Sequence, residues 1–176
     1  MEIIVKWFSG YGKRYMNANA VSNVVHYIYR GALECSDRKR IYGSIGMINQ
    51  SDPEKIIQEM METKKIYNLT HGVQCKHMTV SLGKAPNLSR KKIIKKIRKM
   101  LHPFADKYQI FYGVHDNNIL PGLENYHIHV MLNSIDMNRR RKISISPKEY
   151  QRFYDGVQKI WSTHWKVSAI WIVNIR

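Results

Sequence analysis

Apolar and polar residues alternate along Tyr126-His127-Ile128-His129-Val130-Met131-Leu132-Asn133, the most informative stretch of this 176-residue chain. Alternate side chains of a β-strand lie on opposite faces of its sheet. One face would carry Tyr126, Ile128, Val130 and Leu132, and the other His127, His129, Met131 and Asn133. The pattern therefore predicts a strand at residues 125–132, with one face in a core and two histidines together on the other.

A second strand is predicted at residues 108–115, directly before the histidine strand. The link between the two contains turn-forming residues and is too short for a helical crossover, so the strands should form an antiparallel hairpin. Alternation places Phe111, Gly113 and His115 on one face. If His127 and His129 share that face, three imidazoles meet at one end of the hairpin.

The remaining periodicity predicts a mixture of strands and helices at irregular intervals. Apolar residues at helical spacing predict helices at residues 18–29, 53–67, 89–104 and 147–165, with Ser51 or Asp52 capping the second and Ser146 the last. Further strands are predicted at residues 3–8, 40–48, 73–82 and 169–175. We interpret residues 1–176 as a single α+β domain, with a central antiparallel β-sheet and helices packed on it.

The charge favours a polyanionic partner. Lys and Arg number 29 against 13 Asp and Glu, a formal net charge of +16, and such a field attracts nucleic acid. Candidate phosphate contacts are the run Arg139, Arg140, Arg141 and Lys142, and Lys91 and Lys95 in the third predicted helix. For any single run a solvated face is the commoner role, so the total charge is the stronger argument.

Two further expectations concern the compartment. No apolar run approaches the roughly 20 residues of a membrane span, so we expect no membrane partner. Cys35 and Cys75 form no CxxC pair, and they are expected to be packing residues in a reducing, cytoplasmic environment.

Three neutral imidazoles at one end of a hairpin suit a transition metal and leave coordination positions open for a reaction. A histidine on a strand is often only structural, so His127 and His129 alone favour a metal site only slightly. His115 at the end of the neighbouring strand strengthens the argument. Asp116 either accepts a hydrogen bond from an imidazole or is a turn residue.

Covalent cleavage of a phosphodiester requires a hydroxyl near such a metal. The chain has 11 tyrosines, most of which should pack in the core or at interfaces. Two regions compete for the role: Tyr27 and Tyr29 in the first predicted helix, and Tyr150 and Tyr154 in the last. The latter two are four residues apart and share a helix face.

The order of these features resembles the MobA-type mobilization relaxases of the HUH endonuclease superfamily, over residues 21–154. Asn23-Val24-Val25-His26-Tyr27-Ile28 is similar to the family's tyrosine motif, and Lys76-His77-Met78-Thr79-Val80-Ser81-Leu82 to its strand ending near a serine. His115-Asp116 followed by residues 127–133 resembles its three-histidine motif. The segment between Asp116 and His127 is longer than the family's pattern.

The resemblance implies site- and strand-specific DNA nicking and rejoining at the transfer origin of a plasmid or integrative element. Tyr27 would attack and form a 5′-phosphotyrosine, while His115, His127 and His129 hold Mn²⁺, Mg²⁺ or Zn²⁺. Asp116 and Asn133 would orient these ligands through hydrogen bonds without binding the metal themselves. The implied partners are single-stranded origin DNA and accessory relaxosome proteins, and the sequence does not predict an oligomeric state.

Several alternatives remain open from the sequence. His26 or Tyr29 could replace Tyr27 as the nucleophile. A single-tyrosine transposase or replication initiator of the same superfamily would use Tyr150 or Tyr154. A non-catalytic basic nucleic-acid-binding protein and a metal-dependent RNA-cleaving enzyme are the other readings. The histidines His77, His102 and His164 are predicted to be structural, although His77 could lie in the sheet near the site.

Overall fold

A computed structural model of the protein describes residues 3–8, 15–35, 40–82, 86–116 and 126–161, together with the backbone of residues 167–172. The helices are α1 (Ala20–Glu34), α2 (Pro53–Ile66), α3 (Arg90–Ala105) and α4 (Pro147–Trp161). The strands are β1 (Ile3–Phe8), β2 (Tyr42–Ile45), β3 (Cys75–Ser81), β4 (Ile110–Asp116), β5 (Tyr126–Asn133), β6 (Ile135–Asp136), β7 (Arg141–Lys142) and β8 (Val167–Ile172).

Six strands form the main sheet, in the order β2-β4-β5-β3-β1-β8. Every neighbouring pair is antiparallel except β1 and β8, which are parallel. The predicted α+β class and the predicted β4–β5 hairpin are therefore confirmed. The parallel pair at the edge was not foreseen, because the order of strands distant in sequence cannot be read from periodicity.

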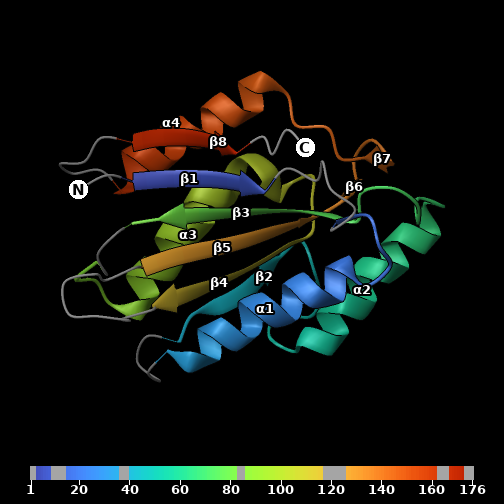
Figure 1. Ribbon diagram of the computed structural model, residues 1–176, viewed down its shortest axis with the longest axis horizontal. Helices are drawn as coiled ribbons and strands as arrows, with labels where there is room; N and C mark the ends of the chain where they lie inside the picture. The colour runs from blue at the N-terminus through green and yellow to red at the C-terminus, as the bar shows by residue number, and fades with distance from the viewer. Residues whose placement is uncertain are drawn as a thin grey trace.

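Helices cover both faces of the sheet (Figure 1). The core between the sheet and α3 and α4 contains Ile128 and Val130 of β5, while Met131 packs with α1 and α2 in a second core. This division is the one that the alternation in β5 predicts. No helix within the described part of the chain is long and apolar enough to cross a membrane.

The boundaries differ from the predictions in a few places. Helix α1 continues five residues past the predicted end at residue 29, because Gly31 and Ala32 are small residues buried where the helix crosses the sheet, not a helix stop. Helix α4 ends at Trp161, and residues 162–166 lie outside the described residues. The short strands β6 and β7 were not predicted.

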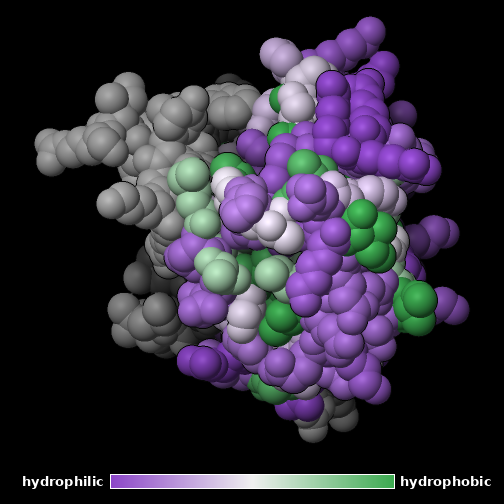
Figure 2. All heavy atoms as spheres, turned by 90° about the vertical axis from the view of Figure 1, so that its right-hand side faces the viewer, coloured by the Kyte–Doolittle hydropathy of each residue, from purple (hydrophilic) through white to green (hydrophobic). Residues whose placement is uncertain are grey.

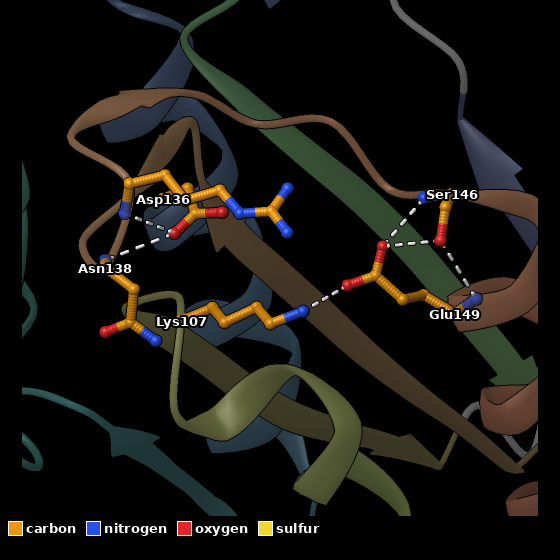
Figure 3. A network of polar contacts seen from close by, with 6 residues as sticks. Lys107, Asp136, Asn138, Ser146 and Glu149 are labelled. Atoms are coloured by element: carbon orange, nitrogen blue, oxygen red, sulfur yellow. Dashed lines mark hydrogen bonds and ion pairs between the residues drawn. The ribbon is translucent and has the colours of Figure 1, made fainter.

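Side-chain caps fix the starts of two helices. Asp52 accepts hydrogen bonds from the backbone of Glu54 and Lys55 at the start of α2. At α4, the amide of Glu149 donates to Ser146 Oγ, and Ser146 donates back to the Glu149 carboxylate, a reciprocal capping box. Lys107, after α3, forms an ion pair with the same carboxylate (Figure 3). Glu149 therefore ties two segments of the fold together.

We predict that Glu149→Gln lowers the free energy of unfolding at neutral pH by about 1–3 kcal/mol. Burial alone would raise the pKa of Glu149, but hydrogen bonds from Lys107 and Ser146 outweigh it and lower the pKa to about 2, from 4.5. The folded pKa is depressed, so this stabilisation is present above pH 4.5 and is lost as the pH falls towards 2. Urea unfolding of both proteins across that range tests it, with the exposed Glu62→Gln as control. A pH-independent difference would contradict the prediction.

A second prediction concerns Lys64, which is fully buried in α2 and contacts Met61 Sδ at 3.8 Å. Burial lowers the pKa of Lys64 to about 8, from 10.5, so the charged amine destabilises the fold at neutral pH. Lys64→Met should raise the free energy of unfolding at pH 7 by about 1–3 kcal/mol.

The advantage of Lys64→Met should shrink as the pH rises from 8 to 10.5, because the wild-type amine then enters the folded state uncharged while the unfolded chain still binds the proton. Denaturation at several pH values measures the difference between the two curves. The exposed neighbour Lys65→Met is the matched control and should change stability by less than about 0.5 kcal/mol. Equal effects at both positions would refute the argument from burial.

Candidate active site

Three histidines lie together on the α1 side of the β4–β5 hairpin. His115 pairs directly with His127, and His129 lies two residues further along β5. The ring centroids of His115 and His129 are 4.0 Å apart, and those of His127 and His129 are 5.9 Å apart. The predicted convergence of three imidazoles on one sheet face is therefore confirmed.

Helix α1 places Tyr27 against this cluster. The Tyr27 ring centroid is 5.2 Å from those of both His115 and His129, and the side chain is 53% exposed. The tyrosine is therefore packed beside the imidazoles on one side and accessible on the other. No other tyrosine of the two candidate regions has this position.

Two glycines allow α1 to approach so closely. A Cβ atom on Gly113 of β4 would lie 2.6 Å from Ile28 Cγ2, and one on Gly31 of α1 would lie 2.3 Å from the His115 ring. Both distances are far below van der Waals contact. The helix can therefore rest on the hairpin only where these side chains are absent.

Each imidazole of the cluster has one ring nitrogen in a hydrogen bond. His115 Nε2 donates to the Ile28 carbonyl at 3.0 Å. His127 Nδ1 lies 2.7 Å from Ser81 Oγ, and His129 Nδ1 lies 3.1 Å from His77 Nε2. The second nitrogen of each ring is left for another partner.

Strand β3 supplies two of these partners. Ser81 pairs with His127 and His77 with Met131 in the β3–β5 register, so both project to the same face as the cluster. His77 was predicted to be structural, and its contact with His129 was missed. The alternation of His77, Thr79 and Ser81 signals a shared face, but the pairing of β3 with β5 cannot be deduced from the sequence.

Burial holds the three imidazoles in the neutral form. It is the largest cause lowering the pKa of His115, of His127 and of His129. Repulsion from His115 lowers the pKa of the other two further, whereas the hydrogen bond to Ile28 acts in the opposite direction on His115. Neutral imidazole is the form that binds a metal.

The donor set fits a divalent transition metal in its chemistry. Three neutral imidazoles are available, and each is held through one nitrogen by a hydrogen bond, an arrangement that commonly supports metal-bound histidines. Over the described ranges, however, no three His, Cys, Asp or Glu side chains already share one metal position. Binding an ion would therefore require at least one ring to turn.

Hollows lie on both sides of Tyr27, and both are lined by Tyr27 and Asn23. One, of about 420 Å³, has aromatic walls that include Phe8, Tyr15 and His77. The other, of about 490 Å³, is lined by charged and polar groups that include His26, Arg30 and His115. The tyrosine thus stands between two spaces of different character.

Two residues expected to support the ligands do not contact the histidines. Asp116 follows His115 and therefore points to the opposite face of β4, where it lies near Tyr126; burial first, and then this carboxylate, raise the pKa of that tyrosine. Asn133 is fully buried and donates to the Met60 carbonyl at 3.1 Å and to Gln109 Oε1 at 2.7 Å. The structure does not bring either residue to the histidines.

The basic residues singled out from the sequence are also distant from the cluster. Lys91 and Lys95 lie on α3, across the sheet from the histidines. The run 139–142 follows the far end of β5, roughly 20 Å along the strand from His127 at about 3.4 Å per residue. Arg139, Arg140 and Arg141 are exposed, whereas Lys142 is half-buried and donates to the Val73 carbonyl.

Figure 2 shows this end of the molecule, where α2, β6 and β7 face the viewer. Hydrophilic side chains cover most of its coloured surface, with hydrophobic ones scattered among them. Such a surface suits contacts with a charged partner better than burial in an apolar interface.

The rival nucleophiles have other surroundings. Tyr150 and Tyr154 pack against the core under α3 and α4, and Tyr150 lies 4.9 Å from the Trp7 ring. Burial raises the pKa of Tyr154 to about 12. The ring centroids of Tyr29 and Tyr42 are 5.0 Å apart, and His26 Nε2 lies 3.2 Å from Glu54 Oε1. Only His26 among these four lines a hollow beside Tyr27.

The family model of the MobA/VirD2-like relaxase nuclease domain matches residues 27–164, well over half of the chain. The chain belongs to this family of relaxases, and the resemblance noted from its motifs is confirmed. Membership makes it a DNA-nicking domain and implies binding to single-stranded origin DNA; relaxases of this family generally use a divalent metal. A comparison with curated proteins gave no match.

We predict that Gly31→Ala destabilises the protein by about 1–3 kcal/mol, although alanine is the better helix former, because the new methyl group overlaps the His115 ring. Gly156→Ala in α4 is the control, since a Cβ there meets no atom within 4 Å, and it should stabilise by about 0.5–1 kcal/mol. Thermal unfolding followed by circular dichroism measures both. A stabilising Gly31→Ala would show that the helix does not depend on this close contact.

Proposed function

We propose that the protein is an HUH-type relaxase that nicks and rejoins one DNA strand at the transfer origin of a plasmid or integrative element. Tyr27 is the nucleophile, and the product is a covalent 5′-phosphotyrosine. In this proposal residues 1–176 form a single nuclease domain that acts in the cytoplasm during mobilization or conjugation, with accessory relaxosome proteins as further partners.

The observation that carries the proposal is the position of Tyr27, 5.2 Å from the rings of both His115 and His129 and still half exposed. A phosphodiester approaching the phenol from solvent would meet the histidine cluster at the same time. Covalent phosphoryl transfer requires a nucleophile and the groups that activate the phosphate on one surface.

The step can be written with its bonds balanced. The Tyr27 oxygen forms a bond to phosphorus and loses its proton, while the bond from phosphorus to the 3′ oxygen of the preceding nucleotide breaks. That oxygen takes up a proton and leaves as a 3′-hydroxyl. Because a phosphodiester is exchanged for a phosphodiester, the 3′-hydroxyl can attack the phosphotyrosine later and reseal the strand.

His115, His127 and His129 are the residues that would hold a divalent metal such as Mn²⁺, Mg²⁺ or Zn²⁺. When bound, the metal polarises the phosphate and neutralises the charge that develops on its oxygens. The chain's own contribution is to keep the imidazoles neutral and to hold them through Ile28, Ser81 and His77. Asp116 and Asn133 are not part of this arrangement, because Asp116 projects to the opposite face and Asn133 lies at the far end of β5, bonded to Met60 and Gln109.

The two hollows beside Tyr27 give the strand a route across the site. The aromatic one could hold a base through stacking contacts, and Arg30 in the polar one could contact a phosphate. Arg139, Arg140, Arg141, Lys142, Lys91 and Lys95 are too distant to contact the same nucleotides. We propose that they add affinity for flanking DNA, which would fall steeply with salt concentration.

The alternatives are less well supported. Tyr150 and Tyr154 lie across the sheet from the histidines, half-buried against the other core, which counts against the transposase and replication-initiator mechanisms. A non-catalytic binding protein would have no use for an exposed tyrosine beside three neutral histidines. The RNA-cleaving alternative is tested by comparing the cleavage of matched single strands of DNA and RNA.

The test is to incubate the full chain with labelled single-stranded DNA from its element's origin, with Mn²⁺ or with EDTA. A denaturing gel reports any covalent adduct. We expect an adduct with Mn²⁺ and none with EDTA, and Tyr27→Phe should reduce it by at least about 10³-fold, because the nucleophilic oxygen is absent.

Tyr29→Phe and Tyr154→Phe are the matched controls and should retain the adduct. If the adduct persists in Tyr27→Phe, the nucleophile lies elsewhere, and its loss in Tyr154→Phe would instead favour the transposase mechanism. Tight binding without any adduct, independent of metal, would favour a non-catalytic protein.

A further inference from the structure

His77 occupies a position that the proposed reaction does not explain. It projects from β3 to the face of the histidine cluster, is 5% exposed, and stacks on Phe8 with ring centroids 4.8 Å apart. Its Nε2 lies 3.1 Å from His129 Nδ1, and its Nδ1 lies 3.4 Å from the Tyr15 hydroxyl. The three side chains form a buried chain of hydrogen bonds that ends at the cluster.

Only two arrangements of protons satisfy this chain when both imidazoles are neutral. In the first, His129 Nδ1–H donates to His77 Nε2, and His77 Nδ1–H donates to the Tyr15 oxygen. In the second, Tyr15 donates to His77 Nδ1, and His77 Nε2–H donates to His129 Nδ1. The positions of the heavy atoms are the same in both.

The two arrangements differ at the far nitrogen of His129. In the first, His129 Nε2 carries a lone pair and can bind a cation. In the second, it carries a hydrogen and cannot. The direction of the hydrogen bonds from Tyr15 to His129 therefore decides whether His129 can be a ligand, because one neutral imidazole has one donor and one acceptor nitrogen.

We infer that His77 is a positioning residue that, together with Tyr15, holds His129 in the orientation and tautomer in which Nε2 is free to bind a divalent metal. The inference rests on the metal-dependent relaxase function proposed above. His77 acts through His129 and does not itself touch the metal or the DNA phosphate. It accepts the His129 hydrogen in the way that a carboxylate or backbone carbonyl does at many metal sites.

The burial of the site makes this role necessary. His129 is 5% exposed, so without His77 its Nδ1–H would have no water to replace the lost acceptor, and an unsatisfied buried donor is costly. His129 would then turn or adopt the other tautomer, and the metal would lose a ligand. The corresponding partners of His115 and His127 are the Ile28 carbonyl and Ser81, which remain in place.

Two variants of His77 separate positioning from packing. His77→Phe keeps an aromatic ring to stack on Phe8 but removes the hydrogen-bond acceptor. His77→Gln places an amide oxygen near the former Nε2 and can still accept from His129. Tyr15→Phe removes only the hydroxyl that bonds to His77, at the end of the hydrogen-bond chain away from His129. The control is His102→Gln, an exposed histidine of α3.

The first measurement is the dissociation constant of Mn²⁺ for the full chain, by isothermal titration calorimetry without DNA. We expect His77→Phe to weaken binding by about 10–100-fold. His77→Gln should stay within about 3-fold of wild type and Tyr15→Phe within about 5-fold, and His102→Gln should be unchanged. Unfolding temperatures measured in parallel show whether each variant is folded.

The second measurement uses wild-type protein alone and needs no variant to fold. Long-range ¹H–¹⁵N spectra distinguish the two neutral tautomers of a histidine, and we expect metal-free His129 to carry its hydrogen on Nδ1. The opposite tautomer overturns the inference. Wild-type affinity in folded His77→Phe also overturns it, and equal losses in His77→Phe and His77→Gln would make His77 a direct ligand instead.

The outcomes also separate this inference from the proposed function. If no DNA adduct forms but Mn²⁺ affinity and the His129 tautomer follow the expected order, the positioning role stands and the nicking mechanism fails. If the adduct forms through Tyr27 but His77→Phe binds Mn²⁺ normally, the nicking mechanism stands and the positioning role fails.

Discussion

The close approach of α1 to β4 is the contact on which the site depends. Ile28 is fully buried, and its side chain fills the space above Gly113 that any larger residue would occupy. The carbonyl of the same residue accepts the His115 hydrogen bond. Since Tyr27 precedes Ile28 in the helix, the contact that anchors one residue in the core also holds the next beside the histidines.

In the proposed function, the cluster must meet two requirements that usually conflict. A metal ligand must be neutral and oriented, while a substrate site must be reachable from solvent. Burial beneath α1 keeps the imidazoles neutral. Ile28 of α1 and Ser81 and His77 of β3 each hold one nitrogen of a ring. Solvent reaches the site at Tyr27, whose side chain is exposed between two hollows.

The basic residues singled out from the sequence lie away from Tyr27 and the histidine cluster. The basic face of α3 lies on the other side of the sheet, and the arginine turn lies at the far end of β5. A duplex or strand that reaches these residues must extend well beyond the nucleotides that we propose to lie at Tyr27. Affinity and catalysis can therefore be altered independently, because phosphate contacts act over the Debye length whereas the reaction needs atomic contact.

The sequence by itself determined the α+β class, the β4–β5 hairpin and the shared face of His115, His127 and His129, because local alternation and short connections carry that information. It also singled out Tyr27 through the order of its motifs, although spacing alone left Tyr150 and Tyr154 as rivals. Only the tertiary structure shows which of the two regions lies beside the histidines, since it sets α1 and α4 on opposite faces of the sheet. The pairing of β3 with β5, which brings His77 and Ser81 to the cluster, was likewise invisible. Contacts between strands about 50 residues apart leave no local pattern, because they arise from how the whole sheet minimises exposed apolar surface.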